Sequence, residues 1–337
     1  MKKVFNLLVS FVLIAGFSAC SKDDPGNQQV PKNPVPSADY KGLAFISSGE
    51  STVRLAQVGT PYEISLEYST DESHWKPYTI GETITLADST FLLFRSGEHK
   101  NRKFSKDDEN YYHFEISGPI STQGNIMSLL NRDFSTPLTF YGFFALFEGC
   151  TSLLSAPELP ATTMAQGCYF RMFAECTGLK SAPELPAEAL AYNCYGRMFK
   201  GCSALTYVPD LPATKMEAYC YNSMFANCTS LKFAPELPAK RLESNCYQHM
   251  FEGCTSLTSA PELPAIELVS NCYEFMYKDC RNLRYVIGLF TTEPSEKTTK
   301  DWLSGVAASG TFIKSEKATW DVTGVHGIPE GWKIETW

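Results

Sequence analysis

Residues 250–265 read MFEGCTSLTSAPELPA, and residues 224–239, 26 positions earlier, read MFANCTSLKFAPELPA. Written in blocks of 26, the middle of the chain keeps this pattern through six copies without an insertion. A constant period of this length is the sequence signature of a solenoid. One repeat has too few apolar side chains to hold itself folded, so each copy must bury them against its neighbours. The pattern therefore predicts a stack of similar coils.

The columns of the alignment identify the expected core. One aromatic column is followed three residues later by a cysteine column, and a second cysteine column is followed directly by tyrosine. The aromatic column consists of Phe147, Phe173, Phe199, Phe225, Phe251 and Tyr277. The cysteine columns are Cys150, Cys176, Cys202, Cys228, Cys254 and Cys280, and Cys168, Cys194, Cys220, Cys246 and Cys272. We expect each column to form a continuous buried spine.

Two kinds of element are expected within a repeat. Leu257 to Leu263 has the composition of a short strand, although Pro261 lacks a donor for a β-ladder. Past the next Pro-Ala pair the apolar spacing becomes three and four, as at Leu190, Cys194 and Met198, which favours a short helix on the outer side. The fold class predicted from these features is α/β, a leucine-rich-repeat-like solenoid of 26-residue repeats preceded by a small β-sandwich.

The repeat resembles the BspA-like branch of the leucine-rich-repeat proteins, whose units carry a Met-Phe-x-Gly-Cys-x-x-Leu core. The resemblance covers roughly residues 120–290 and rests on the whole recurring pattern. It implies a solenoid on a cell surface that acts in adhesion or recognition. On this basis we expect the chain to bind a host or microbial surface protein, and the alternative is a glycan.

The N-terminus predicts export. Lys2 and Lys3 precede an apolar run that is short for a membrane span, and the run ends before Cys20. Residues 1–19 are therefore read as a signal peptide. The FSAC sequence at 17–20 resembles a bacterial lipobox, which implies lipidation of Cys20. The following SKDD resembles the surface-export signal of Bacteroidota lipoproteins. It implies an outer-membrane lipoprotein that faces the cell exterior, with a periplasm-facing lipoprotein as the alternative.

The structure of the remaining segments is predicted from their composition and sequence pattern. Residues 20–39, rich in Pro, Asn and Gln, are expected to form a flexible tether. Short strand signals separated by turns predict the β-sandwich at 40–118. The solenoid is expected at 119–290 with a degenerate first repeat, in which Phe143 falls in the tyrosine column and Met127 in a leucine column. Residues 291–337 are expected to form a C-terminal cap, with a helix that carries Trp302 and two closing strands.

The eleven repeat cysteines have spacings of 18 and 8, which match no zinc-binding pattern. A column of buried thiols suits a tight core. Disulfides remain an alternative, because export favours them and stacked neighbours would lie within bridging distance. A metal site is the third possibility.

The candidate binding face consists of two columns that vary between repeats. Two residues after a core leucine stand Tyr207, Phe233 and Tyr285, where other copies have serine. One residue after that leucine stand Lys232 and Arg284. The resemblance to leucine-rich repeats implies that these positions point outward from the strand, and aromatic side chains at such sites often anchor partners. Packing against an adjacent loop or the N-terminal domain is the competing explanation.

Other functions have little support in the sequence. The chain has no Gly-x-Ser-x-Gly, His-Glu-x-x-His or P-loop motif, and its five histidines are scattered. We therefore expect no enzyme activity, no catalytic residues, no cofactor and no metal. The net charge is -8 and no Lys/Arg stripe is present, so nucleic acid is not an expected partner. The only expected contact with a membrane is the lipid anchor.

Overall fold

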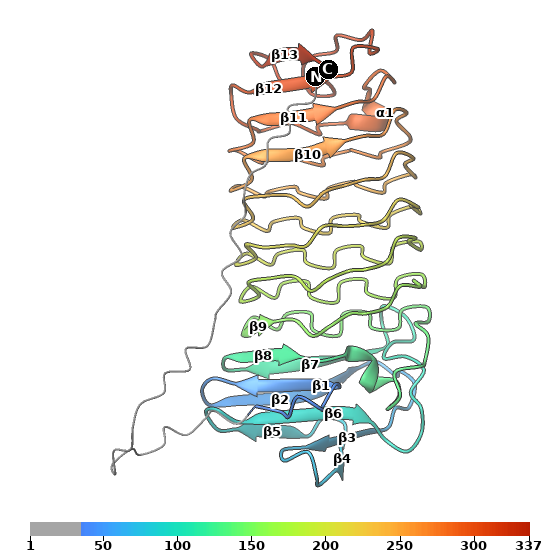
Figure 1. The fold of residues 1–337 in the computed structure, drawn as a ribbon, viewed down its shortest axis with the longest axis vertical. Helices are drawn as coiled ribbons and strands as arrows, with labels where there is room; N and C mark the ends of the chain where they lie inside the picture. Colours follow the sequence, from blue (N-terminus) through green and yellow to red (C-terminus); the bar gives the residue numbers. More distant parts are fainter. Residues whose placement is uncertain (1–34) are drawn as a thin grey trace, which may run out of the picture. The chain divides into compact units, whose positions relative to one another are not determined.

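The computed structural model describes residues 35–337, which form one compact unit. Figure 1 shows antiparallel strands at one end, a stack of coils in the middle, and parallel strands at the other end. The predicted signal peptide, Cys20 and most of the predicted tether lie outside the described residues.

Strands dominate the regular structure. The upstream strands are β1 (Leu43–Ser47), β2 (Ser51–Val58), β3 (Leu66–Ser69), β4 (Lys76–Pro77), β5 (Thr83–Leu86), β6 (Phe91–Ser96), β7 (Tyr111–Ser117) and β8 (Ile120–Gln123). The coils contain β9 (Leu153–Ser155), β10 (Ser259–Leu263) and β11 (Tyr285–Gly288), and the C-terminal end adds β12 (Thr311–Lys314) and β13 (Lys333–Thr336). Within residues 35–337, helix is limited to the 3-10 turn η1 (Ile126–Leu129) and to α1 (Glu296–Thr299).

The upstream strands form two sheets that share a core. One sheet has the order β4-β3-β6-β1-β8-β9, and the other has the order β5-β2-β7. Phe45 of β1 packs against Phe114 of β7, with 4.9 Å between the ring centroids. Strand β8 pairs in parallel with β9, which belongs to the first coil, so the upstream sheet continues into the solenoid.

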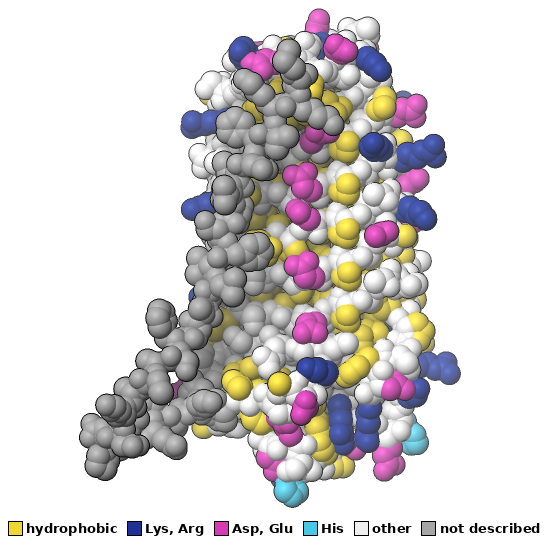
Figure 2. Space-filling view, in the orientation of Figure 1, with side chains coloured by type: hydrophobic (Ala, Val, Ile, Leu, Met, Phe, Trp, Pro, Cys, Tyr) yellow, Lys and Arg dark blue, Asp and Glu magenta, His cyan; other side chains and the backbone are white. Residues whose placement is uncertain are grey.

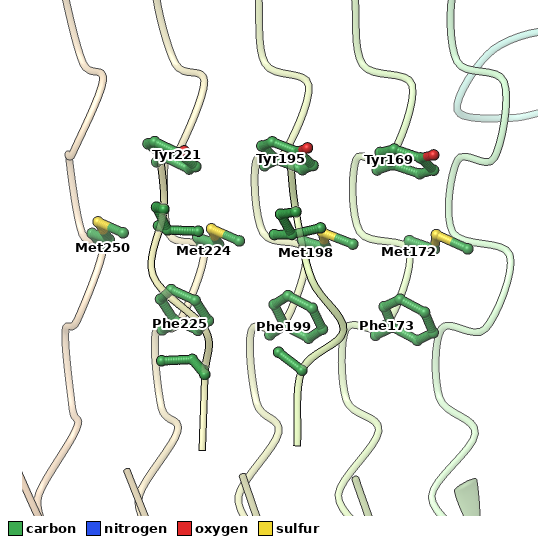
Figure 3. Packing of buried hydrophobic residues seen from close by; sticks show 14 of the residues in the cluster. Tyr169, Met172, Phe173, Tyr195, Met198, Phe199, Tyr221, Met224, Phe225 and Met250 are labelled. Carbon is green, nitrogen blue, oxygen red and sulfur yellow. The ribbon is translucent and has the colours of Figure 1, made fainter. Parts of the chain in front are cut away.

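The coils stack in register at 26-residue intervals. Phe173, Phe199 and Phe225 lie one above another, with centroid separations of 5.5 and 5.7 Å and rings within 4° of parallel. A second spine runs through Tyr169, Tyr195 and Tyr221 at 6.0 and 5.8 Å. Figure 3 shows both spines, with Met172, Met198 and Met224 between them. The predicted 26-residue solenoid with buried columns is confirmed.

The predicted outer helices are wrong, and with them the α/β class. The segment 167–176 and its copies, called here the turn segments, consist of successive turns. In the first of them Gly167, Arg171 and Glu175 have φ values of 60°, 59° and 59°, so every fourth residue is left-handed. An α-helix does not tolerate this conformation. The apolar spacing of three and four therefore arises from four-residue turns that each bring a pair of side chains inward.

Backbone hydrogen bonds explain why the turn segments remain extended along the coil. Tyr169, Arg171 and Phe173 donate their N–H groups to carbonyls of the next coil at 2.9–3.1 Å. The residues between them donate within the coil to the carbonyl three positions earlier, as in Met172 to Tyr169 at 3.2 Å. Each turn segment thus divides its donors between local turns and the neighbouring coil.

The strand side of each repeat is short and irregular, as Pro261 and its equivalents predicted. Strand β10 pairs in parallel with β11, and the register shifts between Ser259 and Glu262. Most other repeats have only isolated bridges there, such as that between Ser181 and Tyr207. A proline in the ladder removes an N–H donor, so continuous pairing cannot form.

Both ends of the stack agree with the predictions in part. Phe143 stacks on Tyr169 at 6.1 Å, in the tyrosine column. The residue that pairs with Leu153 is Ile120 of β8, not Met127. At the other end Trp302 is not helical, because α1 ends at Thr299 and Trp302 continues the tyrosine spine at 6.1 Å from Tyr273. Strands β12 and β13 pair in parallel and close the stack, within the segment 291–337 where two closing strands were predicted.

The spines predict that substituting a buried aromatic residue lowers the free energy of unfolding far more than substituting an exposed one. Replacing the fully buried Phe199 by alanine should lower the free energy of unfolding by about 3–5 kcal/mol, because it removes contacts within its own coil and with two neighbours. Phe233→Ala, at a side chain that is 69% exposed, should change it by less than about 0.5 kcal/mol. Urea denaturation measures both, and equal losses would contradict the stacked-spine description.

The left-handed positions predict how strongly different substitutions there lower the stability of the fold. Gly149 has a φ of 74° and open space where a Cβ would lie, so a substitution there reports on backbone strain alone. Gly149→Ala should cost about 1 kcal/mol, whereas Gly149→Asn should cost less, because asparagine tolerates this conformation and occupies the equivalent position at Asn227. Thermal denaturation measures the stability of both variants. An alanine variant more stable than the asparagine variant would contradict the prediction.

Candidate functional site

The predicted binding face is solvent-exposed. Tyr207 and Phe233 are 60% and 69% exposed, and Tyr285 is 39% exposed. The predicted cations Lys232 and Arg284 are also exposed. We call these five residues the ridge. Their exposure argues against the competing explanation, which was packing against an adjacent loop or the N-terminal domain, because their side chains face solvent in the described part of the chain.

The ridge lies where two successive residues of each coil face solvent. Leu205 and Val208 point inward, and the two residues between them point outward. Tyr207 and Phe233 are 26 residues apart and lie on successive coils, whereas Ser259 separates Phe233 from Tyr285, with which Ser259 is in register. The structure therefore brings Tyr207 and Phe233 together as a pair and leaves Tyr285 further along the column.

An acidic column runs beside the ridge, three residues further along each coil. Its members are Glu158, Glu184, Asp210, Glu236 and Glu262. Figure 2 shows acidic side chains in a line along the stacked coils, with a line of apolar side chains next to them. None of these five forms an ion pair with another described residue, and the same holds for Lys232 and Arg284. The face therefore offers aromatic, cationic and anionic groups in parallel lines.

The repeat cysteines lie in the core. All eleven are free and buried. In one column each thiol donates to the phenylalanine carbonyl of the preceding coil, as Cys176 does to Phe147 at 2.9 Å and Cys202 to Phe173 at 3.1 Å. Burial raises the pKa of Cys150 and Cys254 to about 12. A neutral buried thiol is a poor nucleophile and a poor metal ligand, so these columns serve packing.

The turn segments carry a groove that the sequence analysis missed. Its volume is about 800 Å³, and Asn222, Ser223 and Ala226 form its floor, each at most 8% exposed. Arg197 and Lys200 stand on the preceding coil, and Gln248, His249 and Glu252 stand on the following coil. Two outward columns become short on one coil, at Ser223 and Ala226, between neighbouring coils that carry Arg197 and Lys200 on one side and His249 and Glu252 on the other, and this difference creates the hollow.

Hydrogen bonds fix the polar groups of the groove. The side-chain amide of Asn222 donates to Oε1 of Gln248 at 2.8 Å, and Gln248 donates to Glu274 at 2.5 Å. On the far wall Nδ1 of His249 lies 2.6 Å from Oε2 of Glu252, and this contact lowers the pKa of the Glu252 carboxyl below its usual value. The floor is therefore ordered before any ligand arrives.

Other chemistry is limited among the described residues. No cluster of three or more His, Cys, Asp or Glu side chains in residues 35–337 has a geometry suited to a metal ion. In the same part of the chain, no helix combines the length and the hydropathy needed to cross a bilayer.

The buried thiols predict slow reactivity and a defined pH dependence. In a Cys20→Ser chain the native protein should react with Ellman's reagent at a small fraction of the rate seen in urea. The unfolded thiols ionise near their ordinary pKa of 9.0, whereas the folded thiols of Cys150 and Cys254 stay protonated up to about pH 12. Only the unfolded state loses these protons between pH 9 and 12. The free energy of unfolding should therefore be highest below pH 9 and should fall as the pH rises from 9 to 12.

Rapid reaction of several thiols in the folded chain would contradict the buried columns. Urea titrations at pH 7 and pH 10 test the pH dependence.

Comparison with known proteins gave no relative. No family model, no curated protein and no solved structure matches the chain.

Proposed function

We propose that the chain is a non-enzymatic recognition module that binds a surface protein of a host or another microbe through the ridge. The observation that carries this proposal is the exposure of Tyr207 and Phe233 on successive coils, with the unpaired Lys232 beside Phe233. Isolated exposed apolar residues are common, but two large aromatic side chains on neighbouring rows of a rigid surface have the composition of interface anchors.

The neighbouring columns support a protein partner. Aromatic side chains flanked by Lys232, Arg284 and the acidic column offer both apolar contact and charges of both signs. Such a mixture is typical of protein interfaces, where aromatic anchors lie within a polar rim. Regular 26-residue spacing also presents these groups at constant intervals, which suits a partner that lies along the stack.

The proposed setting is a bacterial cell surface. The lipobox-like FSAC, the SKDD that follows it and the resemblance of the repeats to BspA-like leucine-rich-repeat proteins support a lipoprotein anchored in the outer membrane and exposed to the exterior. In this proposal the upstream sheets would form a small β-sandwich between the anchor and the solenoid.

The ridge is tested by a double substitution. Biotinylated chain is used to capture proteins from host and microbial surface extracts, and each captured protein is then purified and its affinity measured directly. Tyr207→Ala with Phe233→Ala should weaken binding by at least about 2 kcal/mol, or roughly thirtyfold, if the pair is a hot spot.

The control is Ile266→Ala, which removes an exposed apolar side chain outside the ridge, 57% exposed. It should leave the affinity unchanged. Unaltered binding by the double variant to every captured protein would refute the ridge as the interface.

A further inference from the structure

A second binding site is supported by the groove on the turn segments, which the proposed function does not use. No ridge residue lines it. Its volume of about 800 Å³ lies in the range of small-ligand sites, about 300–1,000 Å³. Its floor carries the polar side chains of Asn222 and Ser223, and the Asn222 amide is held by Gln248 at 2.8 Å.

The groove is lined by more basic than acidic side chains, although the whole chain carries a net negative charge. Arg197, Lys200 and Arg281 line it, and none of them forms an ion pair with an acidic residue among those described. Of its two lining acids, Glu252 is already held by His249 at 2.6 Å and by Lys278 at 3.7 Å, and Asp279 forms no ion pair with another described residue. Three free cations and one free carboxylate therefore face the hollow, on a protein whose net charge is -8.

The rest of the lining suits a hydroxyl-rich ligand. Asn222, Ser223 and Gln248 supply amide and hydroxyl groups at the floor. Tyr192, which is 43% exposed, and Tyr219 present aromatic rings at one end, 5.6 Å apart and edge to face. Aromatic rings offer an apolar surface with a polar handle, which matches the alternation of C–H faces and hydroxyls on a sugar ring.

We propose that the groove between Arg197 and Glu252 binds an acidic oligosaccharide, with Arg197 and Lys200 pairing with a uronate carboxylate and the Asn222–Gln248 amides bonding to sugar hydroxyls. A guanidinium group suits this role because its planar fork matches a carboxylate. The ring of Phe170, 5.8 Å from the Arg197 guanidinium carbon, flanks that side chain. The ordered floor reduces the entropy cost of binding.

The test uses trimers of galacturonate, guluronate and glucuronate, the methyl esters of the same trimers, and citrate, with calorimetry as the readout. At least one uronate trimer should bind, and its ester and citrate should bind about tenfold or more weakly, because each lacks either the charge or the sugar. Absence of binding by all three trimers at millimolar concentration would overturn the proposal, and so would equal binding of the ester or of citrate.

The variants are chosen to keep the turn segment intact. Arg197 has a φ of 55°, so Arg197→Asn removes the charge with a residue that accepts left-handed geometry. This variant and Lys200→Gln should each weaken uronate binding by about tenfold or more. The matched control is Arg171→Asn, at the same position one coil earlier, where φ is 59° and the side chain pairs with Glu148 outside the groove.

Arg171→Asn should bind as the parent does, and so should Phe233→Ala on the ridge. Thermal melting shows whether each variant is folded. A folded Arg197→Asn chain with parental affinity would refute the site, whereas loss of protein binding in the ridge variants alone would bear only on the proposed function.

Discussion

The division of hydrogen bonds within the turn segments is the constraint on which the rest of the structure depends. Alternate N–H groups close a local turn and the others pair with the next coil. This arrangement holds only if each coil has the same length, because a shift by one residue would exchange the two sets of donors and turn the inward side chains outward. The absence of insertions through six repeats follows from this requirement.

The same arrangement leaves apolar columns and backbone hydrogen-bonding groups without a neighbouring coil at each end of the stack. Different structures cover the two ends. At the N-terminal end Phe114 of β7 stacks on Phe147 at 5.1 Å, and its carbonyl accepts from the Cys150 thiol at 3.0 Å, as a preceding coil would do. At the C-terminal end larger rings replace the spine, and Trp320 stacks on Phe290 at 5.2 Å. A solenoid needs such caps because an open end exposes the apolar columns.

The fold could be predicted from the sequence where the same physical requirement acts in every repeat. It could not be predicted where a helix and a series of turns give the same spacing of apolar residues. The period, the inward columns such as Phe199 and the irregular strand near Pro261 could be predicted, because burial and the missing proline donor act in every copy. The helices could not, since pairs such as Cys194 and Met198 have the same spacing in a helix and in four-residue turns. The distinguishing signal lay in Gly, Asn and Asp recurring eight residues apart within a coil, as at Asn193 and Gly201.

The two candidate sites differ in predictability for a related reason. Tyr207 and Phe233 stood out because they are large where other repeats have serine, and the resemblance to leucine-rich repeats implied that they point outward. The groove depends on short side chains at Ser223 and Ala226, which reveal a hollow only when those columns are known to face outward. Since inward residues carry the stability and outward ones cost little to change, a stacked scaffold of this kind can acquire separate surfaces on different faces while its core stays constant.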